Sequence, residues 1–123
     1  MKVGIFDSGL GGLTVVSEIK KKYPKSSIIY LGDTARVPYG TRSKEVIEEF
    51  AVQDAKFLES KKVDLIIIAC NTVSAVAVDT VKKAVSVPVY EVITAAKNAA
   101  VKATKNGKIG VIATRATINS GAY

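Results

Sequence analysis

The 123-residue sequence contains no histidine and a single cysteine, Cys70. Without histidine it cannot build a Ser-His-Asp triad or a Cys-His nucleophile pair, and one cysteine allows neither an internal disulfide nor the usual zinc sites. We therefore expect no metal. Long apolar runs are also missing, because Val63–Ala69 is far shorter than the ~20 residues of a membrane span, and Met1–Lys2 lead straight into a strand-like segment without a signal-peptide pattern. These absences predict a cytoplasmic chain with no membrane contact.

What is present is the composition of a folded domain. The chain is 48% hydrophobic and 24% charged, which excludes disorder and collagen, and its length suits about one domain. The net charge of +7 raises the question of a nucleic-acid partner. We expect none, because the lysines gather near the ends of predicted helices, where cations complement the helix dipole, and no aromatic-rich basic motif is present. These lysines are Lys20, Lys21, Lys22, Lys61, Lys62, Lys82, Lys83, Lys102 and Lys105.

Short β-branched runs alternate with helical patterns along the whole chain. The predicted strands are Val3–Phe6, Ser27–Leu31, Val63–Ala69, Val87–Val92 and Lys108–Ala113. The predicted helices are Gly12–Tyr23, Ser43–Ser60, Val73–Val85 and Ala95–Thr104. Several strands are apolar on both faces, as helix-covered parallel strands are. The order predicts an α/β fold with an open, mostly parallel, flavodoxin-like sheet and flanking helices.

Local signals support two of these elements. Ser43 suits an N-cap of the second helix, whose apolar stripe is predicted to include Phe50, Phe57 and Leu58. Gly107 suits a turn before the predicted fifth strand.

Polar residues follow four of the five predicted strands. In open α/β sheets, ligands bind beyond the carboxyl ends of the strands, so these segments are expected to converge on one site. They are Asp7–Thr14, Gly32–Thr34, Cys70–Thr72 and Thr114–Thr117.

The glycine-rich segment after the first strand resembles known phosphate loops only in part. Gly9 and Gly11 match the start of a dinucleotide motif, but Thr14 stands at its third glycine position, and no Lys-Ser/Thr pair follows for a Walker loop. Asp7 could be a phosphatase-type nucleophile, yet Gly9 occupies the place of the second acid. The alternative is that the glycines form a tight turn that Asp7 caps.

Cys70 ends the most hydrophobic strand and precedes Asn71 and Thr72. A thiol at a helix N-terminus lies at the positive end of the dipole, which stabilises the thiolate and favours a base or nucleophile. The alternative is a buried cysteine that acts as a small apolar residue. In the loop after the second strand, Pro38 and Gly40 could hold Tyr39 over a cleft while backbone N–H groups meet an anion.

The chain resembles the glutamate racemase family over essentially its whole length. Three segments, Gly4–Gly12, Tyr30–Gly40 and Ala69–Ser74, are similar to the three N-terminal signatures of that family, and Gly110–Ile118 with Ser120–Tyr123 resembles its next segment. The resemblance implies a cofactor-independent enzyme that interconverts L- and D-glutamate and supplies D-glutamate for peptidoglycan and cell-wall synthesis.

The resemblance also implies residue roles. Cys70 is the thiol that acts on one face of the α-carbon, a second cysteine acts on the other, and Asp7 assists proton movement at Cys70. Glutamate is the expected partner, and a homo-oligomer is expected. The implied substrate contacts are Asp7, Ser8, Tyr39, Gly40, Asn71, Thr72, Thr114 and Thr117.

The sequence departs from the family in length. Family members are about twice as long and form two α/β domains around the active site. The second cysteine of the family, in a Cys-Thr-His motif, is missing here. The chain is therefore expected to be an inactive N-terminal half, truncated relative to the two-domain racemase. Residues 1–93 are expected to form an incomplete first domain, and residues 94–123 the start of the second. Two alternatives stay open: a racemase or isomerase for aspartate or another small acid, and a non-catalytic anion- or nucleotide-binding module.

Overall fold

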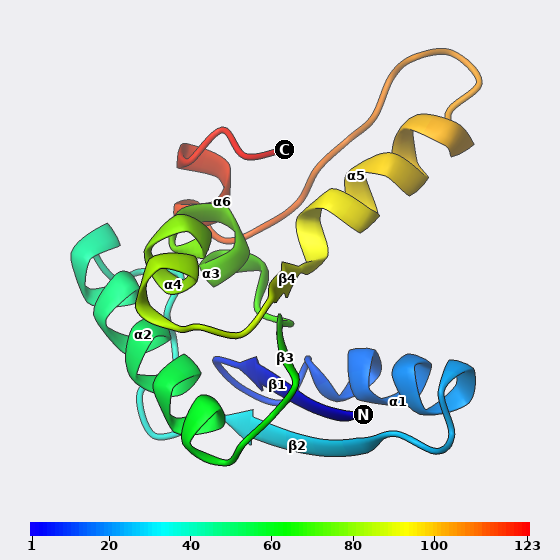
Figure 1. The fold of residues 1–123 in the computed structure, drawn as a ribbon. Helices are drawn as coiled ribbons and strands as arrows, with labels where there is room; N and C mark the ends of the chain where they lie inside the picture. The colour runs from blue at the N-terminus through cyan, green and yellow to red at the C-terminus, as the bar shows by residue number, and fades with distance from the viewer.

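The computed structural model describes residues 1–123 and contains one four-stranded sheet (Figure 1). Every pair of neighbouring strands is parallel, and the strand order is β2-β1-β3-β4. That order matches the first four strands of the flavodoxin-like arrangement, so the predicted open parallel sheet is confirmed. The strands are β1 (Lys2–Asp7), β2 (Ser27–Gly32), β3 (Leu65–Ile68) and β4 (Val89–Glu91).

Helices cover both faces of this sheet. On one face, Val3 and Ile5 of β1 pack with Ile19 and other apolar residues of α1. On the other face, Phe6 and Ile68 lie in a larger core with apolar residues of α2 and α4. Each fully buried aliphatic side chain contributes roughly 1.5–3 kcal/mol to this packing. The helices are α1 (Leu13–Lys22), α2 (Lys44–Ser60), α3 (Asn71–Val76), α4 (Val78–Ala84), α5 (Val92–Ala103) and α6 (Arg115–Asn119).

The predicted fifth strand is wrong. Residues 108–113 form no ladder with any strand, and Ile112 is fully exposed. Instead, α5 extends away from the sheet and an extended segment returns to α6, which packs near α3 (Figure 1). The β-branched residues suit a strand, but no neighbouring strand supplies hydrogen bonds to this segment.

The domain boundary predicted at residue 93 falls inside α5 and stays a prediction.

Two predicted helices have different bounds. The third divides at Ala77, whose φ of −126° and ψ of 4° separate α3 from α4. The fourth begins at Val92 rather than Ala95, because the carboxylate of Glu91 accepts hydrogen bonds from the backbone N–H groups of Ile93 and Thr94 at 2.5 and 3.0 Å. No helix is both long and apolar enough to cross a membrane.

The second helix begins as predicted, and Phe50 and Leu58 of the predicted stripe pack in the core, but Phe57 does not. Ser43 caps α2 by accepting a hydrogen bond from the Val46 N–H. Phe57 does not join the core, since it is 45% exposed and the Lys61 ammonium lies 4.7 Å from its ring centre. Asp54 instead occupies the buried stripe and is 4% exposed. A carboxylate in that position requires partners inside the protein.

Candidate functional site

Asp7 shapes the turn that follows β1. Its Oδ2 accepts hydrogen bonds from the backbone N–H groups of Gly9 at 3.2 Å and Gly12 at 3.0 Å. A Cβ at Gly12 would lie 2.8 Å from the Asp7 Cβ and 2.9 Å from the Ala69 Cβ, so the turn requires glycine there. The alternative that Asp7 caps a tight turn is therefore confirmed, and this capping fixes its carboxylate beside the start of α1.

Cys70 lies next to this turn because β1 and β3 are adjacent parallel strands. The Ala69 N–H donates to the Phe6 carbonyl at 2.9 Å, which aligns the two strand ends. Cys70 is the N-cap residue of α3, and its thiol donates to the Ser8 Oγ at 3.3 Å. The thiol is nevertheless buried, 4% exposed, and belongs to the main core cluster. Burial in the core fits the interpretation of Cys70 as a small apolar residue. The N-cap position and the hydrogen bond to Ser8 fit its interpretation as a base or nucleophile, so the structure supports both.

Tyr30 supports the same turn and was not predicted as a site residue. Its hydroxyl donates to the Gly9 carbonyl at 2.8 Å. Burial, followed by the proximity of the acidic groups of Asp7 and Cys70, raises the pKa of Tyr30 to about 12. The phenol therefore keeps its proton and remains a hydrogen-bond donor that holds the glycine turn.

Three predicted threonines form a chain of hydroxyl groups between α3 and α6. The Oγ1 of Thr114 lies 2.9 Å from that of Thr72 and 3.0 Å from that of Thr117. Thr72 and Thr117 are buried, whereas Thr114 is exposed. Thr114 is also the N-cap of α6, so the two helices begin close together, each with N–H groups directed toward its N-terminus.

Asn71, the remaining polar residue at the start of α3, is exposed. Its Oδ1 accepts a hydrogen bond from the Tyr123 hydroxyl at 2.7 Å.

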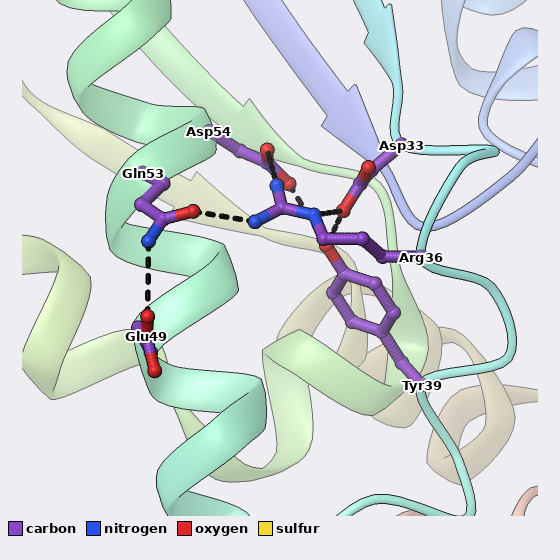
Figure 2. Close-up of polar contacts among 6 residues, drawn as sticks. All are labelled: Asp33, Arg36, Tyr39, Glu49, Gln53 and Asp54. Atoms are coloured by element: carbon purple, nitrogen blue, oxygen red, sulfur yellow. Dashed lines mark hydrogen bonds and ion pairs between the residues drawn. The ribbon is translucent and has the colours of Figure 1, made fainter.

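The Tyr39 ring does not lie over a cleft, contrary to the sequence-based expectation. It is 2% exposed and packs against Phe50, with ring centres 5.5 Å apart. Its hydroxyl lies between the carboxylates of Asp33 and Asp54, 3.1 Å from the Asp54 Oδ2 (Figure 2). Contact between substrate and Tyr39 stays a prediction, and it would have to use the backbone.

Gly40 lies against the start of α6. Its carbonyl accepts a hydrogen bond from the Ala116 N–H at 3.3 Å. A Cβ at position 40 would lie 2.5 Å from the Thr114 Cβ, so only glycine permits this approach.

The partly exposed Arg36 and the buried Asp54 form a charged cluster with Asp33 that was not predicted from the sequence. Burial, followed by the nearby charge of Asp33, raises the pKa of Asp54 to about 6, and Arg36 opposes this rise. One signal was available in the sequence. Asp54 falls at helical spacing with Ile47 and Leu58, on the face that the apolar pattern predicts to be buried.

The predicted site residues gather at one end of the sheet. Ser8 meets Cys70, Thr72 meets Thr114, and the backbone of residues 70–72 joins the two groups. No group of three or more His, Cys, Asp and Glu side chains is arranged to hold a metal ion. A hollow of about 350 Å³ lies elsewhere, between α2, α3 and α6, and contains none of the predicted residues. It is lined by Arg42, Lys44, Ile47, Ala75, Val76, Ala116, Asn119 and Ser120.

Comparison with known proteins identifies relatives of this chain. The family described as Asp/Glu/Hydantoin racemase matches residues 13–123. A glutamate racemase from Aquifex pyrophilus is 55% identical over all 123 residues, which span 48% of its length. The solved structure of a glutamate racemase from the same organism superposes on this chain with a TM-score of 0.98, and the superposition covers all of this chain and 49% of that structure.

Two further solved structures are similar. The glutamate racemase isoform RacE1 from Bacillus anthracis has a TM-score of 0.93 at 46% identity, with 98% of this chain and 46% of that chain covered. The glutamate racemase from Francisella tularensis, solved in complex with D-glutamate, has a TM-score of 0.87 at 52% identity. The match covers 99% of this chain and 46% of that chain. The chain therefore spans about half the length of the relatives that it matches.

Proposed function

Because the chain belongs to the Asp/Glu/hydantoin racemase family, we propose that it forms the N-terminal half of a glutamate racemase active site. The proposed activity is the cofactor-independent interconversion of L- and D-glutamate, with D-glutamate supplied to peptidoglycan synthesis in the cytoplasm. The contact between Cys70 and Ser8 carries this proposal, since it places a thiol among the polar residues at the carboxyl end of the sheet.

In the proposed reaction, Cys70 moves a proton to or from one face of the glutamate α-carbon. Inversion requires a second acid or base on the opposite face, and the chain has no second cysteine and no histidine to provide it. We propose that a thiol from a C-terminal half like that of its relatives takes that role. Asp7 lies at the adjacent strand end, where its negative charge would stabilise a protonated partner and assist proton movement.

The substrate is a dicarboxylate, and the arrangement of α3 and α6 suits such an anion. Both helices begin near the hydroxyl chain from Thr72 through Thr114 to Thr117. Helix N-terminal N–H groups and hydroxyl groups donate to carboxylates. Ser8 and Asn71 would add donors beside Cys70.

Calorimetric titration of the chain with D-glutamate, D-aspartate and a nucleotide tests the proposed ligand. We expect binding of D-glutamate and weaker or no binding of the other two. Preference for D-aspartate would favour an aspartate racemase, and binding of the nucleotide alone would favour a non-catalytic module.

Activity requires a complete cleft. We therefore define a chimera in which residues 1–123 are joined to the part of the Aquifex pyrophilus glutamate racemase that they do not cover. The 55% identity and TM-score of 0.98 make this relative a suitable source. The chimera is expected to racemise glutamate.

A further inference from the structure

The loop between β2 and α2 is held by a charged cluster of two buried carboxylates and the partly exposed Arg36 (Figure 2). Arg36 donates through Nε to the Asp33 Oδ2 at 2.5 Å and through one terminal nitrogen to the Asp54 Oδ1 at 2.8 Å. Its other terminal nitrogen donates to the Gln53 Oε1 at 2.5 Å, and Gln53 donates to Glu49 at 3.1 Å. One guanidinium thus joins the end of β2 to the middle of α2.

The same two carboxylates hold Tyr39. Asp33 and Asp54 are 8% and 4% exposed, and the Tyr39 hydroxyl lies within hydrogen-bond distance of both. Because a phenol has one proton, it donates to one carboxylate at a time. The loop is therefore fixed at residues 33, 36 and 39.

This attachment continues to the candidate substrate site. Gly40 follows Tyr39 directly and accepts the hydrogen bond from Ala116 at the start of α6. The Gly40 backbone also contacts Thr114, whose hydroxyl bonds to Thr72. A change in the position of Tyr39 would thus move the N-terminus of α6 relative to α3.

Energetic considerations argue against stability as the purpose of this cluster. Removing two carboxylates from water, beside a guanidinium that stays partly exposed, carries a desolvation cost that their attraction often fails to exceed, and apolar residues could fill the same space. Buried polar networks do, however, favour one arrangement of their members, because each donor requires its acceptor.

We propose that Arg36 and Asp54 are positioning residues, which hold the Tyr39–Gly40 segment so that Thr114 and α6 face the substrate. The part of this inference that concerns substrate rests on the proposed glutamate racemase function. The part that concerns Gly40 and α6 does not.

The first measurement is steady-state kinetics of the chimera with Asp54→Asn and Arg36→Lys. Asparagine keeps the shape and an acceptor for Tyr39 but loses the charge, while lysine cannot reach both carboxylates. We expect either variant to raise KM for glutamate about tenfold with a smaller effect on kcat, as expected for lost uniform binding. The double variant should raise KM no further than the larger single effect, because both changes break one network.

A purely structural role predicts another pattern. It would reduce the folded fraction and so lower apparent kcat at unchanged KM. Glu18→Gln is the control, because it removes a carboxylate that pairs with Lys21 on the solvent-exposed face of α1, and its KM should equal that of the parent chimera.

The second measurement needs no substrate. Hydrogen exchange of the Ala116 amide is followed by NMR in the 123-residue chain, and Asp54→Asn should accelerate it whereas Glu18→Gln should not. If the chimera fails to racemise glutamate, the proposed function fails, but faster Ala116 exchange still supports positioning of α6. Unchanged exchange, or faster exchange with unchanged KM in an active chimera, overturns the inference. Should Asp54→Asn not fold, Tyr39→Phe carries the same expectations, since it removes only the hydroxyl.

Discussion

Cys70 and Ser8 are 62 positions apart in the sequence, yet the Cys70 thiol donates a hydrogen bond to the Ser8 hydroxyl at 3.3 Å. The contact exists because β1 and β3 are neighbouring parallel strands whose carboxyl ends coincide. It places the only thiol of the chain beside Asp7 and the glycine turn.

Bound substrate should protect Cys70. If D-glutamate occupies the site at ten times its Kd, about nine-tenths of the chain is liganded, and iodoacetamide alkylation of Cys70 should slow about tenfold. Mass spectrometry of the alkylated peptide measures the alkylation rate. D-aspartate at the same concentration is the control ligand. Equal rates with and without D-glutamate, at a concentration that saturates calorimetric binding, would place the ligand away from Cys70.

Gly40→Ala should weaken substrate binding. The new Cβ would lie 2.5 Å from the Thr114 Cβ, so α6 must shift, and overpacking of this kind costs roughly 1–3 kcal/mol. We expect KM of the chimera for glutamate to rise about tenfold. Gly110→Ala is the control, because no heavy atom lies within 4 Å of the position that its Cβ would take. Equal KM values for the two variants would remove Gly40 and Thr114 from the site.

Asp54 should make stability depend on pH. Its pKa is about 6 in the folded chain against an ordinary value of 3.8, so between these values the folded state holds a proton that the unfolded state has lost. The free energy of unfolding therefore falls as pH rises through this window, by roughly 1.4 kcal/mol for each pKa unit.

Asp54→Asn removes this titration. The difference in Tm between the variant and the parent chain should shift in favour of the variant as the pH rises from about 4 to about 7. Above about pH 7 this difference should change little. Circular dichroism melts measure it, and Glu18→Gln serves as the control for loss of an acid. A constant difference across this range would show that the pKa of Asp54 is not raised.

The fold was largely predictable because it depends on local patterns. Apolar runs located β1 to β4, and Ser43 located the start of α2. Strand 108–113 was predicted wrongly because a strand needs a hydrogen-bonding neighbour, which composition does not reveal.

The site was predictable only in part. Ser8, Cys70 and Thr72 follow β1 and β3, and the parallel sheet brings these strand ends together. Thr114 follows no strand and reaches Thr72 because α6 packs against α3, which the strand pattern did not predict. The orientation of a side chain within a loop depends on tertiary partners, and so the burial of Tyr39 against Asp54 could not be deduced from spacing.

The isolated chain should associate with itself. Several apolar side chains in residues 101–123 are exposed, including Val101, Ile112 and Ile118. Exposed apolar surface promotes association, so light scattering should show oligomers, and Ile112→Lys should shift the chain toward monomer. Thr41→Lys, on an exposed loop, is the matched control for added charge. A monomer at high concentration would contradict this expectation.

The most direct test of the account is chiral chromatography of L-glutamate after incubation with the chimera, its Cys70→Ala variant and the 123-residue chain alone. We expect the chimera to produce D-glutamate until the two enantiomers are equal, and the other two proteins to produce none at a useful rate, because inversion requires groups on both faces of the α-carbon. D-glutamate from the Cys70→Ala chimera at the parental rate, or from the chain alone at the rate of the chimera, would contradict the role assigned to Cys70.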